Sequence, residues 1–363
     1  MPFSDALWLV VPHRLGRAPS QRYRCEQYAP ALEAAGLTLH WLPLLDEADD
    51  RLFYGQATPA AKAALLLRLW HRRRRQLRHI PGGSRVLIHR EAFPVGGPFF
   101  ERQLKRRGCR LIYDFDDTLW LRDVSPANRR WAWLKRPEKT HELFRMADLI
   151  LAGNEYLAEE ARRFSTKVRV MPTTVDTDLY RLNQPRLTDP SRPVVIGWSG
   201  SPTTVGHFLH AVPALEEVKR IFGDRVQFQL IGDARVSISS LNLKGETWSV
   251  GAELAALARF DIGLMPLPDT PWTRGKCGLK ALTYLAFETP AVVSPVGVNR
   301  QIVRPNENGF WAATPTEWVE ALSTLIENTD LRLRLGQQGR ADVESAWSTA
   351  AWADRYIDWI LEV

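Results

Sequence analysis

The sequence predicts an α/β protein built from two doubly wound domains, each with a parallel sheet between layers of helices. Short apolar runs alternate with helix-length amphipathic stretches along the chain, which indicates parallel strands joined by helical crossovers. A proline-rich stretch without hydrophobic periodicity, residues 182–193, interrupts this pattern before it restarts. The length of 363 residues also suits two domains. We therefore predict domains at residues 1–185 and 186–345, followed by a terminal segment at 346–363.

The first domain is expected to contain short buried strands, each followed by a helical stretch. Ser20 suits a helix N-cap, Gly36 and Gly108 suit helix ends, and Thr58 with Pro59 suits the start of a long helix. The strands are predicted at residues 6–11, 37–42, 85–89, 110–115, 149–152 and 168–171. The helices are predicted at residues 20–35, from 59 onward, and at 99–107, 127–146 and 156–163.

The second domain repeats the same alternation. Its strands are predicted at residues 194–198, 226–231, 247–250, 262–267 and 291–294. Its helices are predicted at residues 207–221, 252–258, 276–287, 317–326 and 331–344. The last stretch forms a further helix, because its aromatic and aliphatic residues share one helical stripe: Trp352, Tyr356, Trp359, Ile360 and Val363.

Composition and charge narrow the functional class. Hydrophobic residues make up 45% of the chain, which suits a globular protein with a buried core. No segment approaches the roughly 20 apolar residues of a spanning helix, and no signal peptide is evident. The three cysteines lie far apart, which predicts neither disulfides nor a zinc site, so we expect a cytoplasmic protein. The net charge of +7 suits an anionic small molecule or membrane. Nucleic acid is not expected, because the basic runs lack interleaved stacking aromatics.

Two glycine-containing turns are candidate phosphate sites. The first, residues 197–204, joins a predicted strand to a helix, and its glycine, serine and threonine residues suit phosphate binding at a helix N-terminus. A simple capped turn is the alternative. The second turn, residues 271–280, carries Arg274, Lys276 and Lys280 at the start of a predicted helix. Cations are unfavourable at that end of a helix unless an anion is bound there, so we predict diphosphate binding. A solvated basic turn is the alternative.

Two further segments of the first domain carry polar residues after predicted strands. Asp114, Asp116 and Asp117 end one strand, where they could hold a divalent metal, cap the next segment or pair with arginine. The segment at 12–24 follows the first strand and could contact an acceptor or a phosphate. Its glycine content is too low for a dinucleotide fingerprint.

Basic residues on the predicted long helix suggest a membrane-facing surface. Arg68, Arg72 and Arg75 share one helical face, and Trp70 with several leucines occupies the rest. A second basic and aromatic segment lies at residues 129–136. We predict peripheral attachment to an anionic membrane on its inner, cytoplasmic face. The alternative is that both segments pack on the core and their arginines only increase solubility.

Several segments together resemble the retaining family 4 glycosyltransferases of bacterial type. In the second half these are GWSGSPTT (197–204), FDIGLMPLPD (260–269), the long segment at 274–303 and NENGFW (306–311). In the first half they are residues 20–36, 106–120 and 147–164. The similarity runs in order along nearly the whole chain.

The resemblance implies a GT-B fold, with two facing Rossmann-like domains, an interdomain cleft and a terminal helix that packs back toward the first domain. It implies transfer with retention from a UDP-sugar or GDP-sugar to an acceptor, with no cofactor and no bound metal. The acceptor is expected in the first domain and lipid-linked, in polysaccharide or glycolipid assembly.

The resemblance also assigns residues. The expected catalytic residues are Asp116 and Lys280. The expected diphosphate contacts are Gly200, Ser201, Thr203, Thr204, Arg274, Lys276, Gly278 and Lys280. The expected donor sugar or ribose contacts are Cys277, Leu279 and Thr283, and the expected acceptor or cleft residues are Gly16, Arg17 and Arg22.

Two departures from the family pattern keep other functions open. Many relatives carry two glutamates eight residues apart, where this chain has Gly275 and Thr283. Many also carry Arg and Lys near Ser201, where this chain has no Lys. A non-catalytic scaffold or regulatory subunit is therefore one alternative, and a nucleotide-sugar epimerase of the same fold is another.

Overall fold

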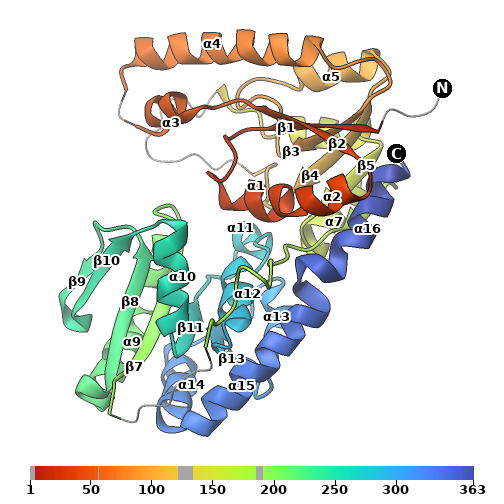
Figure 1. The fold of residues 1–363 in the computed structure, drawn as a ribbon. Helices are drawn as coiled ribbons and strands as arrows, with labels where there is room; N and C mark the ends of the chain where they lie inside the picture. Colours follow the sequence, from red (N-terminus) through yellow and green to blue (C-terminus); the bar gives the residue numbers. More distant parts are fainter. Residues whose placement is uncertain (1–4, 56, 122–133, 185–190) are drawn as a thin grey trace. The chain divides into compact units, whose positions relative to one another are not determined.

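A computed structural model describes residues 5–55, 57–121, 134–184 and 191–363. By their internal contacts the residues divide into two compact units. Unit 1 comprises Met1–Thr173 together with Ala353–Val363, and unit 2 comprises Thr174–Trp352. The last helix, α16 (Thr349–Leu361; blue in Figure 1), begins in unit 2 and ends in unit 1.

Unit 1 contains a six-stranded sheet in the order β2-β1-β3-β4-β5-β6, with every neighbouring pair parallel. After β2 the chain returns past β1 to form β3, so the strand order reverses between β1 and β3. In parallel sheets, ligands bind outside the carboxyl ends of strands at such a switch point. The strands are β1 (Ala6–Val11), β2 (Thr38–Pro43), β3 (Arg85–His89), β4 (Arg110–Phe115), β5 (Leu149–Ala152) and β6 (Val168–Val170).

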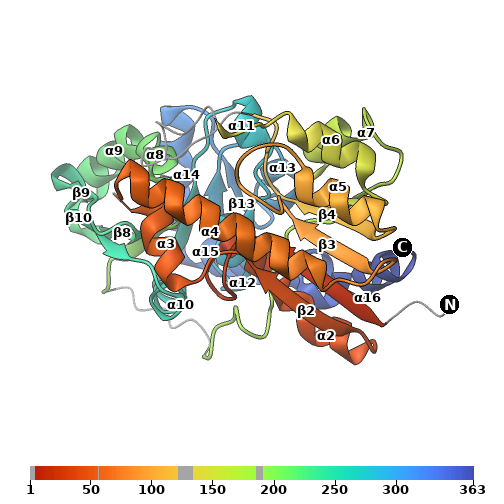
Figure 2. The same ribbon diagram turned by 90° about the horizontal axis from the view of Figure 1, so that it is seen from above.

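Helices cover both faces of this sheet. Figure 1 shows α4 and α5 on one face and α1 and α2 on the other, and Figure 2, which looks onto the first face, shows α4 and α5 beside each other. The helices are α1 (Pro19–Arg24), α2 (Ala29–Ala34), α3 (Glu47–Tyr54), α4 (Pro59–Arg78), α5 (Phe99–Arg106), α6 (Lys139–Met146) and α7 (Glu155–Arg162).

Unit 2 contains a seven-stranded sheet in the order β13-β12-β11-β7-β8-β10-β9, parallel except for the edge pair β10 and β9. Its switch point lies between β7 and β11. The strands are β7 (Val194–Ser199), β8 (Val226–Gly232), β9 (Ser237–Ile238), β10 (Leu243–Thr247), β11 (Ile262–Met265), β12 (Ala291–Val293) and β13 (Gly309–Trp311). The helices are α8 (Val205–Leu209), α9 (Val212–Phe222), α10 (Val250–Arg259), α11 (Pro271–Arg274), α12 (Leu279–Ala286), α13 (Asn299–Ile302), α14 (Pro315–Glu327) and α15 (Thr329–Asp342).

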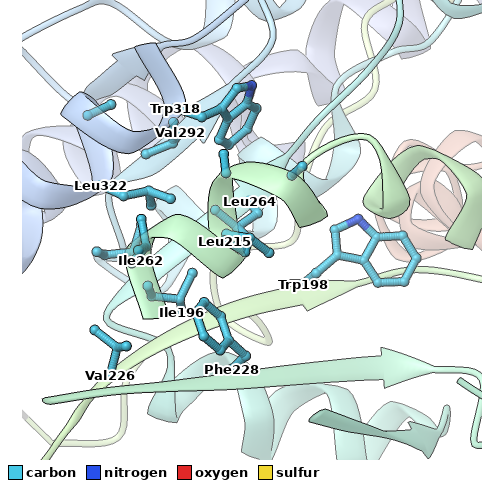
Figure 3. Close-up of a cluster of buried hydrophobic side chains, with 14 of the residues drawn as sticks. Ile196, Trp198, Leu215, Val226, Phe228, Ile262, Leu264, Val292, Trp318 and Leu322 are labelled. Carbon is cyan, nitrogen blue, oxygen red and sulfur yellow. The ribbon is translucent and has the colours of Figure 1, made fainter. Parts of the chain in front are cut away.

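The core of unit 2 fixes the strand ends that carry its site. Ile196 and Trp198 of β7 pack with Leu215 of α9 and Trp318 of α14 (Figure 3). Trp198 is only 1% exposed although it lies one residue before the end of β7. Burial of a large aromatic ring contributes several kcal/mol at about 25 cal/mol per Å². The core therefore holds the end of β7 and the turn after it in place.

Tyr284 of α12 joins the same region to β11. Its ring packs against Gly263, where an added Cβ would lie 2.3 Å from the ring. Its hydroxyl donates to the Leu264 carbonyl at 3.1 Å and accepts from the Ser199 amide at 3.1 Å. The ends of β7 and β11 are thus tied to α12 through one buried side chain.

Some element boundaries differ from the prediction. The helix predicted at 20–35 is divided into α1, a 3-10 turn at Glu26–Tyr28 and α2, with Pro30 in the first turn of α2. The helix predicted at 207–221 is likewise divided into α8 and α9 beside Pro213. Proline lacks an amide donor, so it begins helices rather than continuing them.

Four other elements differ from the prediction. The α3 helix was not predicted, although Asp46 begins it with a capping box. The strand predicted at 247–250 is β10, which ends at Thr247. The helix predicted to begin at Lys276 begins at Leu279, because Gly278 adopts a left-handed conformation at φ 71°. The predicted helix at 127–146 begins before the described residues, which show α6 from Lys139.

Candidate functional site

Unit 1 gathers charged residues at its switch point, around a buried ion pair. Arg24 of α1 pairs with Asp114 of β4, with Nη2 at 2.5 Å from Oδ2 and Nε at 3.1 Å. Their side chains are 1% and 0% exposed. A buried carboxylate is tolerated only when it is paired and hydrogen-bonded. Arg24 therefore compensates the charge of the buried Asp114 carboxylate.

His89 extends this pair toward the surface. Its Nδ1 lies 2.7 Å from Asp114 Oδ1, and its Nε2 lies 2.8 Å from the hydroxyl of Ser20. Ser20, His89 and Asp114 thus form a serine–histidine–aspartate array at the carboxyl ends of β3 and β4. The same geometry activates a serine nucleophile in hydrolases. Here Ser20 also interacts with the Asp116 carboxylate, which would repel the anionic intermediate of acyl transfer.

Asp116, one of the two predicted catalytic residues, is held by Arg90. The Arg90 Nε and Nη2 atoms donate to Asp116 Oδ1 at 2.9 and 2.7 Å. Burial opposes ionisation of Asp116, but the Arg90 charge, with His89 and Ser20, outweighs it and holds the pKa of this carboxyl well below its usual range. Arg90 adopts a left-handed backbone conformation at φ 63°, which costs a non-glycine residue about 1–2 kcal/mol. Asp116 is therefore an ionised hydrogen-bond acceptor.

The three strand-end aspartates do not converge on one point. Asp114 is taken up by Arg24 and His89, whereas Asp116 and Asp117 lie beside Arg90. Among the described residues, one group of metal-ligating types does come together: Cys25, His89 and Asp114, with ligand atoms within 4.8 Å. The Arg24 guanidinium already neutralises Asp114, and burial raises the pKa of the Cys25 thiol. This donor set does not fit a cation.

The predicted acceptor residues have different kinds of partner: Gly16 and Arg17 contact carboxylates, whereas Arg22 contacts an aromatic ring. Gly16 donates its amide to Glu26 Oε2 at 2.8 Å. Arg17 Nε lies 3.0 Å from Asp50 Oδ2. Arg22 instead lies over the ring of Tyr23, with its guanidinium carbon 5.5 Å from the ring centroid.

Several side chains of the long helix α4 that were expected to contact a membrane instead contact other parts of the protein. Trp70 packs against Phe93, Phe99 and Phe100 with ring centroids 4.4–5.4 Å apart. Arg68 and Arg72 both pair with Asp49 of α3.

Within the basic run of α4, Arg73 is fully buried, whereas Arg74, Arg75 and Arg78 are exposed. Burial lowers the pKa of Arg73 to about 9, and its guanidinium donates to the carbonyls of Val11, Leu42 and Ala92. Of the predicted membrane set, Arg68 and Arg75 are exposed, but Arg68 is paired with Asp49. Most of the second basic segment, residues 129–133, lies outside the described residues.

In unit 2 the backbone amides of the turn after β7 donate hydrogen bonds within the protein. Gly200 donates its amide to the Ile231 carbonyl at 2.9 Å, and Ser201 donates its amide to Thr204 Oγ1 at 3.0 Å. The Ser201 and Thr203 hydroxyls lie 2.9 Å apart. The Gly200 and Ser201 amides are therefore not free for phosphate, contrary to our expectation. Hydroxyl groups at this turn remain the groups that could reach a ligand.

The two predicted lysines do come together, although only Lys280 lies on α12. Lys276 Nζ lies 4.7 Å from the Trp272 ring centroid, and Lys280 Nζ lies 5.2 Å from that of Trp198. Burial, Lys280 and Lys276 lower the pKa of His207 to about 4. Burial and Lys276 lower the pKa of Lys280 to about 8. These shifts indicate a cluster of cationic groups at the β7/β11 switch point.

The remaining predicted residues of this turn have other partners. Arg274 Nε lies 2.6 Å from Asp269 Oδ1, which draws its guanidinium to the preceding loop. Thr283 is 3% exposed, and its hydroxyl donates to the Lys280 carbonyl at 2.9 Å. Cys277 Sγ lies 3.7 Å from the Gly275 carbonyl. Leu279 is the first residue of α12, directly after Gly278.

Glu253 of α10 was missed by the sequence reasoning. Its Oε1 accepts a hydrogen bond from the Ser199 hydroxyl at 2.6 Å, and its charge supports the ionised form of Lys280. A carboxylate accepts hydrogen bonds from hydroxyl groups, so Glu253 supplies an acceptor beside the cationic cluster.

Other missed residues are Ser20, Arg24, His89, Arg90 and His207. A usable signal existed for His89, since a polar residue at the end of an apolar strand faces the ligand edge of a parallel sheet. Ser20 was interpreted only as a helix cap. For Arg90 the sequence carries no signal, because its role depends on a left-handed backbone.

A family model and several solved structures are similar to this chain and share its fold. Residues 194–328 match the model of the family described as Glycosyl transferases group 1. The fold is similar to sucrose-phosphate synthase from Thermosynechococcus elongatus, with a TM-score of 0.70 and 14% identity over 98% of each chain. It is also similar to a glycosyltransferase from Rickettsia africae, with a TM-score of 0.68 and 12% identity over 100% of this chain and 99% of that one.

A third similar structure is HepE of Anabaena in complex with UDP, with a TM-score of 0.65 and 13% identity over 99% of this chain and 100% of that one. HepE has also been solved with UDP-glucose. No curated protein sequence matches this chain significantly. These similarities show the GT-B fold, and the domain match at 194–328 supports a glycosyltransferase.

Proposed function

We propose that this protein is a retaining, metal-independent glycosyltransferase that uses a UDP-sugar or GDP-sugar. The observation that carries the proposal is the cluster of Lys276, Lys280 and His207 at the switch point of the group 1 domain. Basic groups held together in a partly buried position suit a polyanionic ligand, because a bound diphosphate would raise the lowered pKa values of His207 and Lys280 again. HepE binds UDP and UDP-glucose, which supports a nucleotide-sugar donor here.

The chemistry of transfer fits such a cluster. Glycosyl transfer builds negative charge on the departing diphosphate, and fixed cations stabilise that charge. Lys276 and Lys280 would perform this role without a metal ion. For retention, we propose that the acceptor hydroxyl approaches on the face of the leaving group, where a phosphate oxygen takes its proton. No enzymatic nucleophile is then needed.

The carboxylates would bind hydroxyl groups. Glu253 lies beside Lys280 and would accept a hydrogen bond from the ribose or the donor sugar. Thr283 is less suited to this, because its hydroxyl is used within α12. In unit 1, Asp116 is ionised and held by Arg90, so it would accept a hydrogen bond from a sugar or acceptor hydroxyl.

Peripheral attachment to an anionic membrane, with a lipid-linked acceptor in polysaccharide or glycolipid assembly, completes the proposal. Its support is the exposed side of α4 with Arg74, Arg75 and Arg78, rather than the paired Arg68 and Arg72. None of the helices among the described residues is long and apolar enough to span a bilayer.

The test is release of UDP or GDP from a panel of sugar nucleotides, with and without lipid-linked acceptors, in the presence and absence of EDTA. Release that requires acceptor and survives EDTA, with a product of retained anomeric configuration by proton NMR, is expected. Binding of nucleotide without release would favour a scaffold. Conversion of the donor sugar without acceptor would favour an epimerase, and loss of turnover with EDTA would overturn metal independence.

A further inference from the structure

Two polar side chains hold the segment between β1 and α1 in place. The Gln21 side chain accepts a hydrogen bond from the His13 amide and donates one to the His13 carbonyl, both at 3.0 Å. Glu26 accepts hydrogen bonds from the Gly16 amide at 2.8 Å and from Gln21 at 2.6 Å. Gln21 itself is fully buried. The segment follows the carboxyl end of β1, at the edge of a parallel sheet where ligands bind, so the protein fixes its backbone at a favourable place for a ligand.

Two arginines of this segment share one carboxylate. Arg17 Nε lies 3.0 Å and Arg14 Nε lies 3.8 Å from the same oxygen, Oδ2 of Asp50. Asp50 is 6% exposed, whereas the side chains of Arg17 and Arg14 are 41% and 44% exposed. His13 Nδ1 lies 3.7 Å from the other oxygen, Oδ1, which is too far for a hydrogen bond. One buried negative charge therefore faces two permanently charged guanidinium groups.

The outer parts of both guanidinium groups are open to a ligand. Among the described residues, the terminal Nη atoms of Arg14 and Arg17 donate no hydrogen bond to the protein. Arg17 lies over the Tyr54 ring, with its guanidinium carbon 5.8 Å from the ring centroid. A hydrogen bond from Arg51 and the charge of Arg14 lower the pKa of Glu47, but the ion pair of Glu47 is with Arg51, at 2.8 Å. The described residues of unit 1 thus balance the charge of the two arginines only in part.

A phosphate ester matches this arrangement. Each guanidinium presents a planar fork of N–H donors that binds two anionic oxygens in parallel. A terminal phosphate has three non-bridging oxygens that point in different directions, so it can accept from two forks at once, whereas a carboxylate offers two oxygens in one plane. The buried Asp50 carboxylate keeps the two side chains together, which lowers the cost of ordering them when a ligand binds.

We propose that Arg14 and Arg17 bind a phosphate group of the acceptor, with Asp50 and Gln21 as positioning residues. The proposal rests on the proposed function for its assignment to an acceptor. Such an acceptor is a phosphate ester, either a soluble sugar phosphate or the phosphate of a lipid carrier. The phosphate is bound and not transferred, so no bond to phosphorus forms or breaks.

Binding is tested without turnover, by isothermal titration calorimetry of the full chain in phosphate-free buffer. The probes are inorganic phosphate, glucose 6-phosphate and phosphatidylcholine vesicles that contain polyprenyl phosphate, with glucose and plain phosphatidylcholine vesicles as their neutral counterparts. Arg14→Gln combined with Arg17→Gln should weaken binding of the phosphate probes by about tenfold, because the contacts are charge-assisted but partly exposed. Arg163→Gln combined with Arg220→Gln is the matched control and should change nothing, since both arginines are exposed and paired with a nearby glutamate.

The probes also separate the sources of the phosphate and the two cationic sites. Inorganic phosphate tests the site itself, whereas a loss seen with glucose 6-phosphate indicates a soluble acceptor and a loss confined to the vesicles indicates a lipid carrier. Binding that survives in the Arg14→Gln, Arg17→Gln variant, or that is lost only with Lys276→Ala and Lys280→Ala, would overturn the proposal. So would a wild-type protein that binds none of the phosphate probes.

Two further measurements separate binding from folding and from catalysis. Asp50→Asn, added to the two arginine substitutions, removes the buried charge that they leave with less compensation, so binding should stay weak while the thermal stability recovers. In transfer assays the Arg14→Gln, Arg17→Gln variant should raise KM about tenfold for a phosphorylated acceptor, with kcat and the donor KM unchanged. An equal rise for the dephosphorylated acceptor would contradict the assignment. A protein that binds phosphate through Arg14 and Arg17 but transfers no sugar would overturn only the proposed function.

Discussion

The two switch-point sites of this protein differ in how their charges are balanced. At the unit 1 site, two guanidinium groups each have a carboxylate partner: Arg24 pairs with Asp114, and Arg90 pairs with Asp116. In unit 2, burial and neighbouring lysines lower the pKa values of His207 and Lys280, and Glu253 is the carboxylate that opposes this for Lys280. The charges of the unit 1 site are thus balanced within the protein, whereas a bound anion would relieve the repulsion between cations at the unit 2 site.

Because of this difference, we expect substitutions at the unit 1 site to change the stability of the fold and substitutions at the unit 2 site to change ligand binding. Breaking a paired buried charge should affect folding, because the partner is left without compensation. Removing a cation from a repulsive cluster should affect ligand binding and leave folding unharmed. The following experiments test the comparison, beginning with the largest expected effect.

Arg24→Met should destabilise the protein by about 3–5 kcal/mol, because Asp114 would remain buried without its cation. The free energy of unfolding from denaturant titration measures this. Arg51→Ala is the matched control, since Arg51 and its partner Glu47 are both exposed, and no measurable change is expected there. Equal stability of the two variants would mean that Asp114 does not depend on Arg24.

Lys276→Ala combined with Lys280→Ala should weaken UDP or GDP binding by about 100-fold, which corresponds to roughly 3 kcal/mol for two charge-assisted contacts. Isothermal titration calorimetry gives the affinity, and thermal unfolding without ligand should show no loss of stability. Arg274→Ala is the informative comparison, because Arg274 pairs with Asp269 and should matter less. Unchanged affinity in the double variant would remove the diphosphate site from this turn.

Nucleotide affinity should fall as the pH rises through about 8, the lowered pKa of Lys280. Burial and Lys276 favour the neutral amine, so below this pH the lysine is charged and binds diphosphate, and above it the charge is lost. Binding near pH 8 should therefore take up a proton, and the affinity should drop by about tenfold by the end of the titration. Calorimetry in buffers of different ionisation enthalpy detects the uptake. Lys280→Arg should abolish it, and a pH-independent affinity in the wild type would contradict this account.

Helix α4 carries both kinds of basic residue, because Arg68 is paired with a carboxylate whereas Arg75 is exposed to solvent. The expected effect of changing them is smaller. Arg75→Gln should weaken binding to anionic liposomes by about fivefold, since a basic residue near such a surface contributes about 1 kcal/mol. Arg68→Gln should have less effect, because Arg68 is paired with Asp49. Co-sedimentation at low salt measures both. A wild-type protein that stays in the supernatant would end the membrane proposal.

The sequence was sufficient for the fold and only partly for the sites. Alternating apolar runs predicted the sheets, and the lysines of the second turn converge as expected, since both follow β11. Their convergence does not use one helical face, because Gly278 delays the start of α12. The unit 1 network was not predictable from spacing. Ser20, His89 and Asp114 are brought together from one helix, α1, and two strands, β3 and β4, and such packing leaves no local pattern in the sequence.

The division of helix α16 between the units has a consequence for synthesis on the ribosome. Unit 1 includes Ala353–Val363. In this segment the ring centroid of Tyr356 lies 4.5 Å from that of Tyr28, and the Val363 carbonyl accepts a hydrogen bond from Arg110. These residues are translated after all of unit 2. At about 5–20 residues per second, the N-terminal unit must wait on the order of ten seconds or more for part of its own core. Until synthesis ends, the nascent unit 1 therefore lacks part of its own core and is a part that a chaperone would have to protect.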